Sequence, residues 1–346
     1  MPFDEKKVTL AKPQEAQAAH AAVVEQFMSE STQLPNVVGL GVGVKWKNGQ
    51  PTGDPALIAL VTHKVDNSQL GARERVPARL GDMQTDVLAI GYPVAGGEAF
   101  DAGIQTLARR SRPARGGYSV GHKNITAGTI ATCVYDILPG GSTTPPVHGV
   151  GVPSRYYILS NNHVLANSNA ASLGDAVLQP GPYDGGTDPA DRIATLSRFV
   201  PIMMAPAVPL TLHRNLVDAA IAEGQFHDLD REIYWNGAVR GWRRKANVTV
   251  GTVVKKTGRT TNFTTGRITV INATVDVGYG GGRTARFIDQ IVTTNISAGG
   301  DSGSLVMTLD NVAVGLLFAG SSVATICNQI ENVRTLLRVE VAEQIL

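Results

Sequence analysis

Short apolar segments rich in Val, Ile and Thr, separated by glycine-rich or polar turns, run through most of the 346-residue chain. Segments of this length and composition predict β-strands. The Asn48-Gly49 dipeptide predicts a tight hairpin turn between the first two of them. We expect strands at residues 37–45, 56–61, 86–90, 128–134, 156–160, 248–254, 268–275 and 312–318.

Helical periodicity is confined to the two ends of the chain. Pro13 and the alanine-rich run behind it predict a helix over residues 13–30. Apolar positions recur at helical spacing over residues 328–346, which predicts an amphipathic C-terminal helix. Many strands with no helices between them are typical of antiparallel barrels or a sandwich. We therefore expect a mostly β protein.

A basic segment at residues 109–117, marked by proline and glycine, divides the chain. Its four arginines could contact an anion, but a solvated connector is the simpler interpretation. The segment predicts a small α+β domain at residues 1–112, a candidate regulatory unit. The β-rich remainder then forms a second domain at residues 113–346.

Composition excludes several functional classes. Lys and Arg number 31 against 29 Asp and Glu, a net charge of +2, so no overall field would attract nucleic acid. No His, Cys and Asp cluster has metal-ligand spacing, so we predict no metal and no cofactor. Cys133 and Cys327 could pair only if the fold brings them together, and a buried free thiol is the commoner state.

Features of the sequence also predict where the protein resides. Residues 1–30 carry several charges and no apolar signal-peptide core. No window approaches about eighteen uninterrupted apolar residues, so we expect no membrane contact. The default is a soluble cytoplasmic protein. The two predicted terminal helices are compatible with a homo-oligomer.

Candidate chemistry centres on the run Gly300-Asp301-Ser302-Gly303-Ser304. A serine between glycines on a tight loop can present its hydroxyl outward. The amides of Gly300 and Ser302 could then bind a developing oxyanion. A serine hydroxyl also needs a positioned base. All seven histidines precede Ser302, which excludes the chain order nucleophile, acid, histidine.

His163 is the best candidate base, because it directly follows an apolar strand, where a rigid scaffold would hold it. Asp218 lies among small apolar residues. A buried carboxylate needs a partner, and a histidine N–H is one. Asp191 is the rival orienting acid, although its neighbour Arg192 indicates a surface ion pair.

Together these motifs resemble those of trypsin-like serine peptidases of the chymotrypsin fold, a double antiparallel β-barrel with its active site between the barrels. Residues 160–165, 217–222 and 300–304 resemble the histidine, aspartate and serine motifs, and residues 256–268 resemble a second-barrel hairpin of bacterial members. The resemblance covers residues 117–340. Residues 36–44 resemble the leader of bacterial relatives of the plant narrow-leaf type peptidases.

The resemblance implies a serine endopeptidase that acts on protein or peptide substrates through an acyl-enzyme. Ser302 would be the nucleophile, His163 the general base and Asp218 the group that orients it. The amides of Gly300 and Ser302 would form the oxyanion hole. Asp301 would hold the oxyanion loop through an internal ion pair, whose partner the sequence does not identify.

The resemblance also implies a substrate pocket formed by Ile296, Leu317, Phe318 and Gly320. Ile296 stands where tryptic enzymes carry an acid, and Leu317 where a glutamyl-specific enzyme would carry histidine. This favours a small or medium apolar side chain at the cleaved residue. Phe318 stands where many relatives have a serine that supports the catalytic aspartate, so the support of Asp218 is left open.

A non-enzymatic alternative fits the same fold. The barrels could form a catalytically silent scaffold that binds peptides or oligomerises. The presence of all three triad residue types favours the peptidase, because a decayed enzyme usually loses at least one of them.

Overall fold

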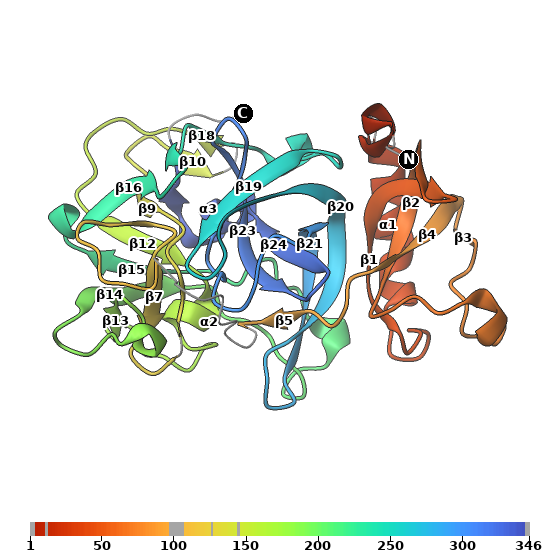
Figure 1. The fold of residues 1–346 in the computed structure, drawn as a ribbon, viewed down its shortest axis with the longest axis horizontal. Helices are drawn as coiled ribbons and strands as arrows, with labels where there is room; N and C mark the ends of the chain where they lie inside the picture. The colour runs from red at the N-terminus through yellow and green to blue at the C-terminus, as the bar shows by residue number, and fades with distance from the viewer. Residues whose placement is uncertain (1–3, 11–12, 97–106, 126, 144–145, 343–346) are drawn as a thin grey trace.

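The structure is a computed structural model that describes residues 4–10, 13–96, 107–125, 127–143 and 146–342. Two curled β-sheets lie side by side, and the N-terminal unit stands on the far side of the second (Figure 1). This arrangement confirms the predicted mostly β, chymotrypsin-like double-barrel fold.

The first barrel is one antiparallel sheet. Its inward-facing side chains, including Ile158, Val177 and Leu196, form a buried cluster. In sheet order its strands are β25 (Val339–Glu340), β9 (Cys133–Asp136), β12 (Tyr156–Ser160), β15 (Ala220–Gly224), β14 (Arg192–Phe199), β13 (Ala176–Leu178), β7 (Ser119–His122) and β8 (Gly128–Thr129).

The second barrel closes on itself because β19 pairs with both β22 and β20. Its six strands are antiparallel to their neighbours. In sheet order they are β19 (Val253–Gly258), β22 (Leu305–Thr308), β23 (Val312–Gly320), β24 (Ala324–Gln329), β21 (Thr284–Thr294) and β20 (Asn262–Gly278).

The N-terminal unit extends the sheet of the second barrel. β1 (Val37–Lys47) pairs with β20, and β2 (Gln50–Val61), β4 (Met83–Ala89) and β3 (Arg79–Leu80) follow outward. Glycine is required in β1 because a Cβ at Gly39 would lie 2.5 Å from the Thr274 carbonyl oxygen. The predicted turn at Asn48-Gly49 is confirmed, with both residues at positive φ.

Helix α1 (Gln14–Phe27) packs on the N-terminal sheet and shares a hydrophobic cluster with β1 and β2. Among the described residues, no helix is long and apolar enough to cross a membrane.

Residues 107–117 lie against the first barrel rather than in solvent. Arg110 pairs with Asp191 at 3.2 Å and Arg115 with Asp230 at 3.0 Å. β6 (Ala114–Gly116) also pairs with β16 (Leu229–Ile233). The predicted solvated connector is therefore a docked segment, while the domain division at residue 112 stays a prediction.

Two predicted elements differ from the structure. The C-terminal helix α3 spans only Ile330–Leu337, because Arg338 is left-handed and the chain continues as β25 against β9. Residues 343–346 of that predicted helix lie outside the described residues. The strand predicted from residue 248 begins at Val253, although Val248 and Val250 are buried.

The predicted strand at residues 128–134 is divided between β8 and β9. The remaining short elements are α2 (Asn162–Leu165), β5 (Val94–Ala95), β10 (Ser142–Thr143), β11 (Pro146–Val147), β17 (Gly237–Ala238), β18 (Gly241–Trp242) and 3₁₀ turns at Glu5–Val8, Asn67–Gln69, Pro182–Asp184, Leu210–Leu212, Phe226–Asp228 and Lys245–Asn247.

Both cysteines are free and buried, in two different hydrophobic clusters. Burial raises the pKa of Cys133 to about 12 and that of Cys327 further still. Both thiols therefore stay protonated at neutral pH and act as small apolar side chains.

Candidate active site

His163 and Asp218 meet at the edge of the first barrel. His163 lies in α2 directly after β12, and Asp218 lies just before β15, the strand that pairs with β12. The ring Nδ1 is 2.6 Å from Asp218 Oδ2, and the His163 backbone N–H donates to Oδ1 at 3.1 Å. The Asp218 side chain is fully buried. The structure thus brings together the predicted base and its orienting acid.

The rival acid, Asp191, has a different setting. Its carboxylate accepts the Thr187 backbone N–H at 2.9 Å and pairs with the exposed Arg110. Its carboxylate thus binds its own loop and the docked segment, whereas the His163 ring binds Asp218.

Tyr279, which the sequence did not single out, also binds Asp218. The phenol donates to Asp218 Oδ2 at 2.6 Å, and its ring meets the His163 ring edge-on at 6.2 Å between centroids. Burial, together with the Asp218 charge, raises the pKa of Tyr279 well above its ordinary value. The phenol therefore keeps its proton and supports the carboxylate. Phe318, where relatives carry a supporting serine, instead packs against Phe287.

We expect Tyr279→Phe to lower kcat by roughly 10- to 100-fold with KM nearly unchanged. A hydrogen bond to a charged group contributes about 1.5–3 kcal/mol, and each 1.4 kcal/mol is a factor of ten in rate. Steady-state kinetics on a peptide substrate measure kcat and KM separately. An unchanged kcat would show that Tyr279 has no part in positioning Asp218.

The serine loop lies between β21 and β22 and is fixed to the first barrel through β8. The Thr129 backbone N–H donates to the Ser302 carbonyl at 2.7 Å. The Thr129 hydroxyl donates to the Gly300 carbonyl at 2.9 Å. Gly303 has φ +98°, and a Cβ there would lie 2.1 Å from Ser160 Oγ. Because Ser160 is three residues before His163, the serine and histidine loops are in direct contact.

Gly300, whose amide is predicted to form part of the oxyanion hole, has a φ of +93°. A Cβ at this position would lie 2.3 Å from an Arg259 nitrogen, so glycine is required for space as well as for conformation. Within the described part of the chain, neither the Gly300 nor the Ser302 backbone amide donates to a protein acceptor. Both amides can therefore bind a substrate carbonyl oxygen.

Asp301 has the internal ion pair that the sequence could not identify. Its partner is Lys256, at 3.1 Å, and neither side chain has any solvent exposure. Backbone amides of Thr260 and Thr261 donate to Asp301 Oδ1 at 2.9 and 3.2 Å. Burial lowers the pKa of Lys256, and the Asp301 charge opposes that shift. The β19–β20 hairpin thus holds Asp301, the residue next to the predicted nucleophile, in place.

The remaining ring nitrogen of His163, Nε2, is buried and has no hydrogen-bond partner among the described residues. The His163 side chain is 8% exposed, and Ser302 is 5% exposed. The Ser302 hydroxyl therefore makes no hydrogen bond to His163 Nε2 in the structure, and the pairing of Ser302 with His163 stays a prediction.

A cavity of about 780 Å³ opens beside Ser302. Leu317 and Gly320 line it, as predicted for the substrate pocket. Ile296 and Phe318 do not: both side chains are buried in hydrophobic clusters. Successive residues of a strand point to opposite faces, so Phe318 turns away where its neighbours face the cavity. Residues that sequence reasoning missed here include Thr261, Asn295 and Ser297.

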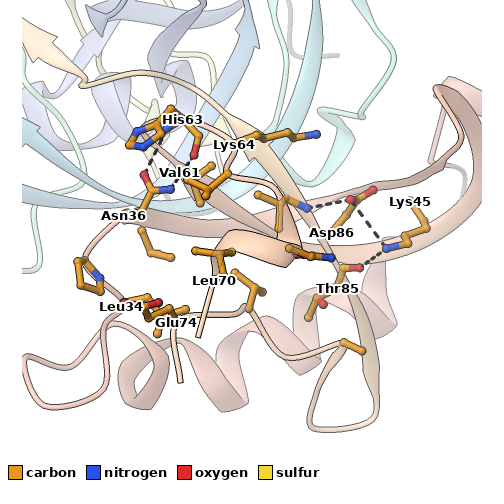
Figure 2. A pocket seen from close by; sticks show the side chains of 17 residues that line it. Leu34, Asn36, Lys45, Val61, His63, Lys64, Leu70, Glu74, Thr85 and Asp86 are labelled. Atoms are coloured by element: carbon orange, nitrogen blue, oxygen red, sulfur yellow. Dashed lines mark hydrogen bonds and ion pairs between the residues drawn. The ribbon is translucent and has the colours of Figure 1, made fainter. Parts of the chain in front are cut away.

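A second cavity, of about 580 Å³, lies in the N-terminal unit (Figure 2). Its polar groups bind one another: Asn36 donates to the His63 carbonyl at 2.6 Å, and Lys45 lies 3.8 Å from Asp86. None of the residues predicted to take part in catalysis lines it. The cavity beside Ser302 is therefore the candidate active site.

The chain matches no known family profile. It is 39% identical over 92 residues to glutamyl endopeptidase 2 of Streptomyces griseus, which is 25% of this chain and 43% of that protein. It is 37% identical over 94 residues to serine protease 2 of Streptomyces fradiae, which is 27% of this chain and 51% of that protein. The chain thus spans about half the length of these curated relatives.

Among solved structures, Thermobifida fusca protease A aligns with 66% of this chain and 97% of its own, with 17% identity and a TM-score of 0.43. One curated relative is named a serine protease and the other a glutamyl endopeptidase, so the predicted resemblance to serine peptidases is confirmed over the matched segment.

Proposed function

We propose that this protein is a serine endopeptidase that hydrolyses peptide bonds of protein substrates through an acyl-enzyme. The observation that supports it most is the buried His163–Asp218 pair at 2.6 Å, because Ser160, three residues before His163, lies against Gly303 of the serine loop. The curated relatives add support from sequence alone.

In this mechanism Ser302 Oγ attacks the carbonyl carbon of the scissile bond while His163 Nε2 takes its proton. Asp218 and Tyr279 stabilise the imidazolium. The Gly300 and Ser302 amides bind the oxyanion of the tetrahedral intermediate. His163 then protonates the leaving amine, and the same groups activate a water molecule that hydrolyses the acyl-enzyme.

Cleavage of a denatured protein tests this proposal. We expect the full-length protein to release peptides that mass spectrometry can identify. The Ser302→Ala variant should release none above background. Equal cleavage by both proteins would mean that a contaminating peptidase, not Ser302, carries the activity.

We further propose that the cleaved residue carries a small or medium uncharged side chain. Within the part of the chain that the structure describes, no charged residue lines the cavity beside Ser302. Leu317 and Ala319 supply apolar surface, and Asn295 and Ser297 supply neutral polar groups. An unpaired charge is costly to bury. The pocket therefore favours neutral side chains.

A peptide library measures this preference directly. We expect kcat/KM for uncharged medium-sized residues at the cleaved position to exceed that for Arg, Lys or Glu by at least ~100-fold, since an unpaired buried charge costs several kcal/mol. A profile dominated by Arg and Lys, or by Glu, would contradict the assignment of the pocket.

A cytoplasmic location and a homo-oligomeric state also stay proposals. Free thiols at Cys133 and Cys327 fit a reducing compartment. Cell fractionation would test the cytoplasmic location. Light scattering on the protein as it leaves a size-exclusion column would test the homo-oligomeric state.

A further inference from the structure

A segment of the N-terminal unit lies along the edge of β23. After β4, the Ile90 amide donates to the Val61 carbonyl at 2.8 Å, and the chain then leaves this unit. β5 pairs antiparallel with β23, with Val94 opposite Gly320 and Ala95 opposite Ala319. On the other side, the Gly278 amide donates to the Pro93 carbonyl at 3.0 Å. Figure 1 shows β5 extending from the N-terminal unit toward α2.

The segment reaches the catalytic groups from this position. Val94 lines the same cavity as Ser302. A Cβ at Gly96 would lie 3.3 Å from His163 Cδ2 and 3.5 Å from Nε2, so the Gly96 backbone lies beside the catalytic ring. The chain therefore runs antiparallel to β23 and passes the His163 ring at Gly96.

Extended peptides commonly bind by adding a strand to a sheet edge. Backbone hydrogen bonds supply the affinity, and pockets for alternate side chains supply the specificity. The β23 edge lies beside Ser302 and the cavity, so a peptide held there would present a bond to the nucleophile. In this structure the chain's own residues hold that edge.

We propose that the chain's own segment 93–96 is an internal competitor of the substrate: it pairs with the Ala319–Gly320 edge of β23, and a peptide must displace it in order to bind there. This inference rests on the proposed peptidase function, because it assigns the same cleft. Because the segment 93–96 is part of the same chain, it competes with a peptide substrate at an effective concentration of roughly millimolar. Val94 is 41% exposed and the pairing is short, so the segment can detach without unfolding the barrel.

Peptide binding to catalytically inactive protein tests the competition. In a Ser302→Ala background, we would measure by fluorescence anisotropy the Kd of a labelled peptide with the sequence of residues 92–96. Adding Ala95→Pro removes an amide donor from β5 and disfavours its place between strands. We expect at least a 10-fold lower Kd in the double variant.

Tyr92→Ala is the matched control. Tyr92 is 72% exposed and precedes the paired residues, so its removal should leave the Kd unchanged. Equal affinity in the presence and absence of Ala95→Pro, or no binding to either protein, would overturn the proposal. Thermal melting shows whether each variant is folded.

Hydrogen exchange on the Ser302→Ala protein gives a second readout, which needs no substitution in β5. Saturating peptide should speed exchange of the amides in residues 90–96. Bound peptide with unchanged exchange there would overturn the proposal. Neither readout requires catalysis, so a failure here is distinguishable from a failure of the peptidase function, which shows as absent hydrolysis by the unmodified protein.

Discussion

Replacing Asp218 by Asn is expected to lower kcat by about 10⁴-fold, while the protein stays folded. Asp218 accepts from three donors: the His163 backbone amide, the His163 ring and the Tyr279 phenol. The amide side chain of the Asp218→Asn variant would place an N–H donor where Asp218 has only acceptors. His163 Nδ1 would then have to accept, which leaves the proton on Nε2, and Nε2 could not take the serine proton.

Steady-state kinetics on a peptide substrate measure this effect, and KM should change little because Asp218 does not contact substrate. Asp191→Asn is the control, since that carboxylate binds its own loop and Arg110. A kcat for Asp218→Asn within tenfold of that of the unmodified protein would show that Asp218 does not orient the base.

Replacing Lys256 by Met is expected to lower the free energy of unfolding by about 3–5 kcal/mol. The substitution leaves the Asp301 carboxylate buried without its cation, and an uncompensated buried charge is strongly destabilising. Activity should fall as well, because Asp301 adjoins the nucleophile and its partners hold the loop that carries the Gly300 and Ser302 amides.

Urea unfolding measures the change in the free energy of unfolding. Lys245→Met is the matched control: its ion pair with Asp289 has a similar length, 2.9 Å, but the lysine side chain is 48% exposed, so we expect a change within about 1 kcal/mol. The double variant Lys256→Met, Asp301→Asn should recover part of the loss, because it removes the buried charge. Equal effects of the Lys256 and Lys245 substitutions would contradict the role of Lys256 in holding Asp301.

The sequence predicted the groups whose chemistry is written into local motifs. Ser302 lies between glycines that the loop requires, and His163 directly follows a buried strand. Asp218 could be recognised because a carboxylate among small apolar residues needs a partner. Short apolar segments likewise predicted some strands of each barrel, such as β12, β20 and β23.

Contacts between distant segments could not be predicted in this way. Tyr279 lies at the tip of a glycine-rich hairpin, 61 residues from Asp218, and nothing around it marks a partner. Lys256 is 45 residues from Asp301. The strand β5 has only two residues, which is too short to show a hydrophobic periodicity. Its pairing with β23 depends on the overall fold.

The C-terminal helix shows the limit of periodicity itself. Apolar residues continue at helical spacing past Leu337, but Arg338 adopts φ +56° and ends the helix. Val339 and Val341 are then buried in the same hydrophobic cluster as Ile330. Tertiary packing against β9 thus overrides the local pattern.

Labelling by a small fluorophosphonate probe, read by peptide mass spectrometry, tests most directly whether Ser302 and His163 act together. We expect a single labelled residue, Ser302, in the full-length protein, and no label in Ser302→Ala. In His163→Ala the labelling rate should fall by at least ~10³-fold. No label on Ser302, or an unchanged rate in His163→Ala, would contradict the peptidase account and leave a catalytically silent scaffold.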